Sequence, residues 1–346
     1  GDAITDSDYN TALGNGSLGA DTKGSKATAI GYQALGTQNF TTATDSYNTA
    51  VGYNSGLSVT TGIRNTILGA EAGDALTDAD HNVALGFRAL SGDTKGSKSI
   101  AIGDVALFSQ NFTTSTDAFN IGIGHEAGNQ VTTGKRNVLL GGLAGDSITS
   151  SDDNIAIGYL ALDANTVGSA NVAIGSHALD AVNPATATTM YNVGIGYAAG
   201  GAVTTGTKNN FIGGLSGDAI TQGSQNVALG TETLSSDTLG SRSVAIGQGA
   251  LFAQNFTTAS TSFNTAIGYE SGVSITTGQS NSLVGYESGK SLTTGFANTV
   301  LGSSALITED TGRYNVAIGA GALENQNNDV DNYNVAVGYN AGNDIT

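Results

Sequence analysis

The sequence predicts an all-β protein, a parallel β-solenoid rod of about 19 coils that continues through residues 1–346. Three observations predict it: a glycine that recurs in steps of 17, 21, 17 and 17 residues, an aliphatic residue directly before each of these glycines, and turn residues at fixed offsets between them. A repeat of about 20 residues is typical of solenoids whose units stack along one axis. The nineteen repeat glycines are Gly14, Gly31, Gly52, Gly69, Gly86, Gly103, Gly124, Gly141, Gly158, Gly175, Gly196, Gly213, Gly230, Gly247, Gly268, Gly285, Gly302, Gly319 and Gly338.

The four steps together form a longer, 72-residue period, which indicates a superrepeat of four coils. Gly31, Gly103, Gly175, Gly247 and Gly319 therefore mark equivalent places. Only the last step, from Gly319 to Gly338, departs from the pattern.

The residues that end at each repeat glycine, as in NTALG and NVAIG, predict the first strand of each coil. Leu, Ile or Val directly precedes the glycine in all nineteen units, and we expect this position to be the core row. Asn stands four residues before the glycine in sixteen units, with Ala27, Ser99 and Ser243 as the exceptions. An apolar residue flanked by a small or polar one fits the two-residue alternation of a strand. We expect the Asn side chains to form hydrogen bonds from coil to coil and not to bind a ligand.

Two further positions show that the interior differs between coils. Two residues before the glycine most units carry Ala or Gly, whereas the residues 72 positions apart at Ile67, Leu139, Phe211 and Leu283 are large. Close packing makes an unmatched change of volume costly, so one coil in four needs more interior space. Four residues after the glycine, two coils with Leu (AL coils) alternate with two coils with Gly (AG coils). We expect this stretch to form a second strand packed on the first.

Turns and loops follow at fixed places. DTKGSK and VTTGKR carry Gly and Asx or Thr at the offsets that tight turns require. The 21-residue coils carry longer segments such as QNFTTATDSY, which we expect to bulge from the rod as a row of loops. At roughly 4.8 Å per coil the loops would recur about every 19 Å, and nineteen coils would span on the order of 90 Å.

Composition limits the possible partners and compartments. Charged residues make up 12% of the chain and the net charge is -17, so the scattered 12 Lys and Arg do not predict nucleic-acid binding. Cys is absent, which excludes disulfides and thiolate metal sites. No signal peptide or membrane span is visible, and we expect the chain to be an ordered section of a longer fibrous protein.

The segments NVAIGSHAL (Asn171 to Leu179) and NTAVGYNSG (Asn48 to Gly56) resemble the head repeats of trimeric autotransporter adhesins. The 17-residue unit with TTG is also similar to repeats of tail-fibre-type proteins of phages and bacteria. The units here are longer than the usual adhesin coil by about three residues, while the resemblance covers essentially the whole chain. It implies a left-handed β-roll in which three chains share one axis, hence a homotrimer.

Other polar patterns favour structural roles over chemistry. We expect the acidic pairs to be solvated turns and not calcium sites, the scattered histidines to be single exposed residues, and the TTG threonines to be turn residues and not an ice-binding array. No catalytic, cofactor-binding or metal-binding residue is assigned, and we do not expect an enzyme. The residues concerned are Asp6, Asp8, Asp78, Asp80, Asp152 and Asp153; His81, His125 and His177; and Thr60, Thr132, Thr204 and Thr276.

The projecting loops are the best functional candidates, because each carries an aromatic cluster. We favour the hypothesis that these aromatic side chains fold back over the coil edge or a neighbouring chain; the alternative is that they face outward as a polyvalent binding row. The aromatic residues are Phe40, Phe112 and Phe256, with Tyr47, Phe119, Tyr191, Phe263 and Tyr333 at the loop ends.

From these observations we expect an extracellular fibre segment, on a phage virion tail fibre or a bacterial cell surface, that spaces or presents a receptor-binding end for host attachment. The alternative is a binding module that recognises a cell-surface glycan or receptor through its lateral loops. We expect self-association, no nucleic acid, no membrane within this segment and no cofactor.

Overall fold

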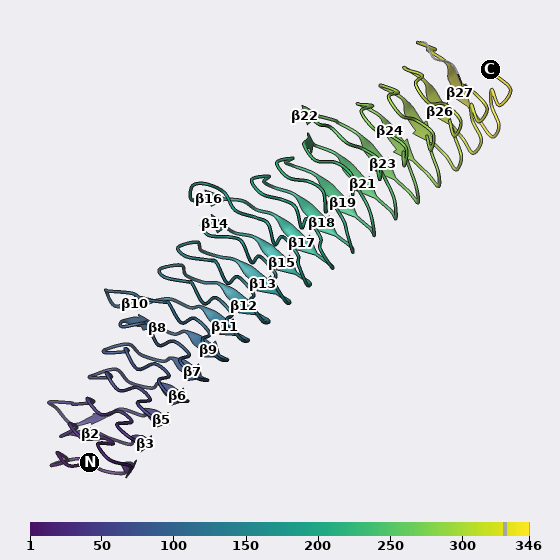
Figure 1. Ribbon diagram of the computed structural model, residues 1–346. Coiled ribbons are helices and arrows are strands. Elements are labelled where there is room, and N and C mark those ends of the chain that lie inside the picture. The colour runs from purple at the N-terminus through teal and green to yellow at the C-terminus, as the bar shows by residue number, and fades with distance from the viewer. Residues whose placement is uncertain (328–330, 346) are drawn as a thin grey trace. The chain divides into compact units, whose positions relative to one another are not determined.

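The computed structural model describes residues 1–327 and 331–345 and is an all-β parallel solenoid of about 19 coils (Figure 1). The described residues contain no helix, and thus none that could cross a membrane. The chain forms two compact units, Gly1–Ala170 with Pro184–Thr188, and Asn171–Asn183 with Thr189–Thr346. The expected solenoid is confirmed.

In the first unit each coil contributes one three-residue strand directly before its repeat glycine. These strands are β1 (Thr11–Leu13), β3 (Thr28–Ile30), β5 (Thr49–Val51), β6 (Thr66–Leu68), β7 (Val83–Leu85), β9 (Ile100–Ile102), β11 (Ile121–Ile123), β12 (Val138–Leu140) and β13 (Ile155–Ile157).

The second unit repeats this arrangement. Its strands are β15 (Val172–Ile174), β17 (Val193–Ile195), β18 (Asn210–Ile212), β19 (Val227–Leu229), β21 (Val244–Ile246), β23 (Thr265–Ile267), β24 (Ser282–Val284), β25 (Thr299–Leu301), β26 (Val316–Ile318) and β27 (Val335–Val337).

All strand pairs within a unit are parallel and join equivalent residues of successive coils. In the pair β6 and β7, for example, Ile67 lies beside Ala84 and Leu68 beside Leu85. The 21-residue coils keep the same register, since Ala101 of β9 lies beside Gly122 of β11. The four additional residues of a long coil therefore leave the ladder and enter the loop.

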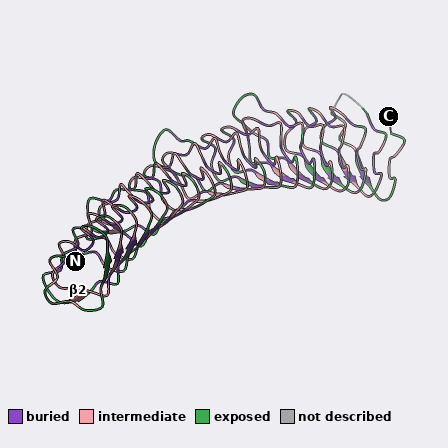
Figure 2. Ribbon diagram, turned by 60° about the horizontal axis from the view of Figure 1, so that its bottom comes forward, coloured by how far each residue is buried: buried purple, intermediate pink, exposed green. Residues whose placement is uncertain are grey.

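Each of these long loops contains a two-residue strand near its end, and this strand pairs in parallel with a two-residue strand of the preceding coil. Figure 2 shows exposed loops standing out from the coils. All residues of the loop-tip segments 41–43, 113–115 and 257–259 are exposed. The expected bulging loops are thus present. The short strands are β2 (Gly24–Ser25), β4 (Thr44–Asp45), β8 (Gly96–Ser97), β10 (Thr116–Asp117), β14 (Gly168–Ser169), β16 (Thr188–Thr189), β20 (Gly240–Ser241) and β22 (Ser260–Thr261). Of these, β4 pairs with β2 and β10 with β8.

The expected core row is wrong. The aliphatic residue directly before the glycine lies on the outer face of the strand, with Leu68 43% and Leu301 49% exposed, while the residue one position earlier, such as Ile67 or Ala84, is fully buried. The reason is the strand's alternation: the Asn four residues before the glycine points inward, and residues at even spacing from it share its face. The inward-facing position of the strand, two residues before the repeat glycine, is therefore mostly alanine.

The expected second strand is also wrong. The residues after each repeat glycine form turns, and the fourth residue has a left-handed backbone, with φ of 56° at Leu90 and 62° at Gly128. In AL coils the Leu side chain fills the interior despite this unfavourable backbone, as the complete burial of Leu90 shows. The alternation of AL and AG therefore sets interior volume and not the length of a strand.

Large interior residues face the glycines of AG coils. A methyl group on Gly56 would lie 2.8 Å from Cδ1 of Ile67, and one on Gly73 would lie 3.4 Å from the same atom. Val59 and Leu76, three residues after these glycines, are fully buried. The expected matching of volume is confirmed, because Ile67 occupies space that leucines fill in AL coils.

The repeat glycine is required by both backbone angle and space. Gly103 has φ of 135°, and a Cβ atom on it would lie 2.7 Å from the carbonyl carbon of Gly124 in the next coil. No other residue combines that angle with so close an approach of two backbones.

The Asn row is structural, as expected, although its partners are mainly backbone groups. The Oδ1 atom of Asn65 accepts from the N–H of Asn82 at 2.9 Å, and its Nδ2 donates to the carbonyl of Ala79 at 2.8 Å. Asn65 is fully buried, so these bonds satisfy groups that would otherwise be costly in the interior. Asn65 thus connects its own coil to the following one.

Candidate functional site

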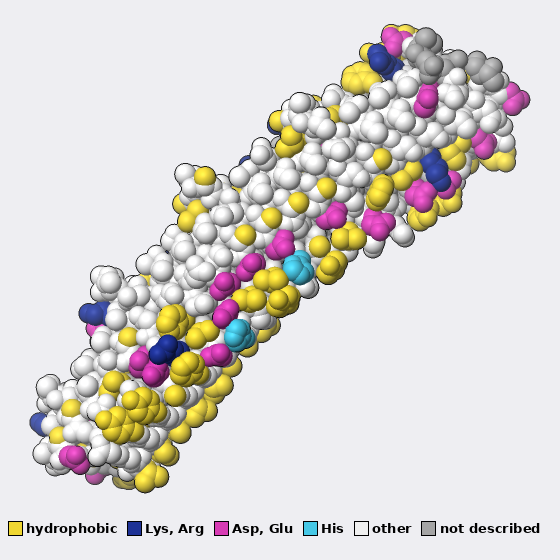
Figure 3. All heavy atoms as spheres, viewed as in Figure 1, with side chains coloured by type: hydrophobic (Ala, Val, Ile, Leu, Met, Phe, Trp, Pro, Cys, Tyr) yellow, Lys and Arg dark blue, Asp and Glu magenta, His cyan; other side chains and the backbone are white. Residues whose placement is uncertain are grey.

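The outer face of the strands is an apolar surface, which we call the strand face. It consists of the residue directly before each repeat glycine, aliphatic in every coil, and the residue two positions earlier, which is never charged. None of the aliphatic residues is buried, and Figure 3 shows hydrophobic side chains gathered along one edge of each unit. Single exposed apolar residues are ordinary on protein surfaces, whereas a contiguous apolar row typically marks a contact with a partner.

Exposed aromatic rings follow the strand face in several coils, directly after the glycine. Tyr32 and Tyr53 stack with centroids 5.4 Å apart, and Tyr269 and Tyr286 stack at 5.5 Å. These pairs lie in successive coils, so the solenoid spacing itself brings the rings into contact.

At the base of the lateral loops the first aromatic residue folds inward. Phe40, Phe112 and Phe256 are only 4–6% exposed. The Thr94 hydroxyl donates to the carbonyl of Phe112 at 2.8 Å, which ties the loop base to the preceding coil. For these phenylalanines the favoured hypothesis of folding back is confirmed.

The aromatic residue at the end of each loop is exposed and does not fold back over the edge of its own coil, whereas cover by a neighbouring chain stays a prediction. Phe119 is 50% and Tyr333 65% exposed, and Tyr47, Tyr191 and Phe263 are similarly exposed. The Lys98 ammonium lies 5.1 Å from the Phe119 ring centroid and 2.5 Å from Asp117. A lysine of the preceding coil and an aspartate of the loop therefore lie beside this ring at the surface.

Beneath the loops lies a buried polar network that was not expected from the sequence. The Gln110 amide donates to Asp93 Oδ2 at 2.5 Å, and Asn120 Nδ2 donates to Gln110 Oε1 at 2.9 Å. Asp93 Oδ1 also accepts from the backbone N–H groups of Gly96 and Phe112. All three side chains of the network are fully buried. The same contacts recur at Asp21, Gln38 and Asn48, and at Asp237, Gln254 and Asn264.

A signal for this network was present in the sequence. Seven residues after the repeat glycine, AG coils carry Val, Ile or Leu, which are buried in all of these coils except the last, whereas AL coils carry mostly Asp, Glu, Asn or Gln at the same position. A polar residue at a core position requires internal partners. Burial raises the pKa of the Asp237 carboxyl, while the hydrogen bond from Lys26 lowers the pKa of exposed Asp45.

The acidic pairs and histidines take part in local contacts between coils. Asp152 Oδ1 accepts from the N–H of Lys135 at 2.8 Å, and Asp153 pairs with Arg136 at 2.6 Å. His125 lies 3.6 Å from Asp104, while His81 lies near Arg64 in another coil. Across residues 1–327 and 331–345, no group of three or more His, Asp or Glu is arranged to hold a metal ion.

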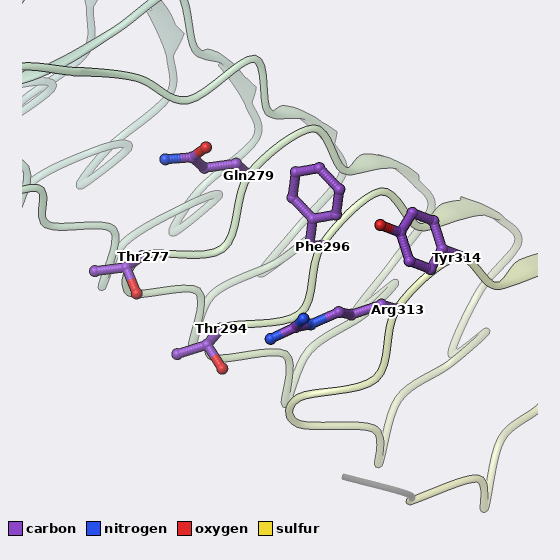
Figure 4. A pocket seen from close by; sticks show the side chains of 6 residues that line it. All are labelled: Thr277, Gln279, Thr294, Phe296, Arg313 and Tyr314. Atoms are coloured by element: carbon purple, nitrogen blue, oxygen red, sulfur yellow. The ribbon is translucent and has the colours of Figure 1, made fainter. Parts of the chain in front are cut away.

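A groove of about 360 Å³ crosses three successive coils of the second unit, beside the loop-end residue Tyr333, which stacks on Tyr314. Its lining is Thr277, Gln279, Thr294, Phe296, Arg313 and Tyr314. Figure 4 shows the two aromatic rings side by side, with the Arg313 side chain extending from its own coil toward Thr294. The sequence alone gave no reason to expect a role for these residues.

No protein-family model matches the chain, and no curated protein matches its sequence.

Proposed function

We propose that the chain is a structural segment of an extracellular fibre, on a phage tail fibre or a bacterial surface appendage, that spaces or presents a receptor-binding end. The strand face carries this proposal. It offers one aliphatic residue per coil, without charge, on a chain whose net charge is -17. The resemblance of NVAIGSHAL to adhesin head repeats supports the same role.

In this proposal three copies assemble in register around one axis, with their strand faces turned inward. Identical coil spacing in each copy lets every aliphatic residue meet its equivalents, so association buries the whole face. The 72-residue superrepeat then places equivalent loops at regular intervals along the fibre, outside the trimer core.

Light scattering on the 346-residue chain tests the assembly. We expect a mass three times that of the 34.4 kDa chain. Leu140→Lys and Leu229→Lys each place a charge on the strand face. Each should dissociate the trimer, because an unpaired charge buried between the chains is costly. Thr114→Lys, at an exposed loop tip, is the matched control and should leave the mass unchanged. A monodisperse wild-type monomer would contradict the proposal.

A second candidate function is recognition of a cell-surface glycan or receptor through the lateral loops. The exposed rings of Tyr47 and Phe119, each beside a lysine, favour it. A glycan array with this segment distinguishes the two, since an inert spacer should bind no glycan and a Phe119→Ser variant should lose any signal that the loops produce.

A further inference from the structure

The groove in the second unit is formed at a position that varies between coils. Six residues before the repeat glycine, Ser is the most frequent residue and stands in seven of the nineteen coils, while nine others carry various residues such as Ile63, Asp80 and Met190. The three successive coils of the groove carry Gln279, Phe296 and Arg313. The seven serines are Ser25, Ser46, Ser97, Ser169, Ser224, Ser241 and Ser262.

Serine at this position has a structural task. Ser97 Oγ accepts from the N–H of Asp80 at 2.9 Å, and Ser241 Oγ accepts from the N–H of Ser224 at 3.0 Å. Phe296 has no hydroxyl with which to make such a bond. Three successive coils therefore carry large side chains in place of a serine that bonds one coil to another, and these side chains meet in one groove.

Arg313 keeps hydrogen-bonding capacity for a ligand. Its Nη1 atom lies 3.8 Å from Asp331 Oδ1, and both side chains are about half exposed. By comparison, Arg136 holds Asp153 at 2.6 Å. A guanidinium has five N–H donors arranged to meet a carboxylate with two parallel hydrogen bonds, and the loose contact with Asp331 leaves that geometry available.

The two aromatic rings supply a fixed apolar surface. Phe296 and Tyr314 meet edge to face with centroids 5.8 Å apart, and Tyr314 stacks on Tyr333 at 5.0 Å with an interplanar angle of 4°. Contact from both sides holds the Tyr314 ring in place, so little freedom is lost when a ligand binds. The hydroxyls of Thr277 and Thr294 and the Gln279 amide line the same groove on one side of the rings and supply donors and acceptors there (Figure 4).

We propose that this groove binds one carboxylated pyranose, such as a uronic acid, within a surface glycan. The C–H face of the sugar packs on Phe296 and Tyr314, its carboxylate pairs with Arg313, and its hydroxyls meet Thr277, Thr294 and Gln279. A volume of about 360 Å³ is at the lower end of ligand sites and holds a sugar residue. A phosphate or a small carboxylate would use the guanidinium but leave both rings uncovered.

Ligand-observed NMR with glucuronate, glucose and acetate as probes tests the site. We expect glucuronate to bind, and glucose and acetate each to bind about tenfold more weakly or not at all. Glucose lacks the carboxylate that pairs with Arg313, and acetate lacks the sugar ring that packs on the aromatic side chains. Equal binding of glucose, or displacement of glucuronate by equimolar acetate, would overturn the proposal. So would the absence of glucuronate binding at about 20 mM.

Two variants introduce the serine that seven other coils carry at this position, which the solenoid accommodates. Phe296→Ser and Arg313→Ser should keep the melting temperature of the wild type and reduce glucuronate binding at least about tenfold. Arg136→Ser, in the first unit and outside the groove, is the matched control and should bind as the wild type does. Binding unchanged in Phe296→Ser and Arg313→Ser would overturn the proposal. These results do not depend on the number of chains, which light scattering measures separately.

Discussion

Phe211 and Gly217 share one interior volume: a methyl group on Gly217 would lie 2.9 Å from Cζ of the Phe211 ring and closer still to its Cδ1 and Cε1 atoms. Gly200, in the preceding coil, faces the same ring, and a methyl group added to it would lie 2.7 Å from Cδ2. A ring at this strand position is thus possible only between two AG coils.

We therefore expect Gly217→Ala to destabilise the solenoid by about 2–4 kcal/mol, because the added methyl overpacks the core and the backbone is left-handed, with φ of 59°. Thermal unfolding followed by circular dichroism measures the loss. Gly214→Ala is the control, since nothing lies within 4 Å of a methyl group there. Adding Phe211→Ala to Gly217→Ala should recover part of the loss, and full additivity of the two changes would contradict the shared volume.

This relationship shows what the sequence could and could not predict. The enlarged positions such as Phe211 and the alternation of AL and AG were visible, and the expectation of matched volume is confirmed. The row directly before the glycine was misplaced, because a strand's alternation can be assigned to either face until one inward residue is known. The inward Asn65, bonded to the coils around it, fixes that choice. The groove at Arg313 could not be predicted from the sequence, because residues from three coils form it.

The two aromatic residues of one loop should respond differently to the same substitution. Phe112→Ser removes a ring that is only 6% exposed and should cost about 3–5 kcal/mol of stability. Phe119→Ser removes a ring that is half exposed and should cost about 1 kcal/mol or less, mainly its contact with Lys98. Urea unfolding of both variants tests this, and equal losses would show that both rings belong to the packed edge.

The buried network predicts a coupled pair of substitutions. Gln110→Val leaves the Asp93 carboxylate without its amide donor and should cost about 2–3 kcal/mol. The equivalent places in the next superrepeat hold Asn165 and Val182, and the Asn165 amide both donates to and accepts from Gly168 of its own turn. The double variant Asp93→Asn with Gln110→Val should therefore be more stable than Gln110→Val alone. A double-mutant cycle in urea measures the coupling, and simple additivity would count against the network.

Acidification should stabilise the solenoid. Burial raises the pKa of Asp237, and burial also raises the pKa values of Asp74, Asp146 and Asp218. A carboxyl whose folded pKa exceeds its unfolded value binds its proton more tightly in the folded state. Its contribution to stability is therefore complete below the unfolded pKa of about 3.9 and is lost as pH rises through the folded pKa.

Exposed ion pairs act in the opposite direction but weakly. The hydrogen bond from Arg136 lowers the pKa of Asp153, so its contribution is lost only as pH falls through that lowered value, and solvent screens the pair. We expect the melting temperature to be higher at about pH 4.5 than at about pH 7.5, with the difference reduced in Asp237→Asn and nearly unchanged in Asp153→Asn. A melting temperature that rises with pH over this interval, or an Asp237→Asn variant with the full wild-type dependence, would show that the buried carboxyls do not govern the response.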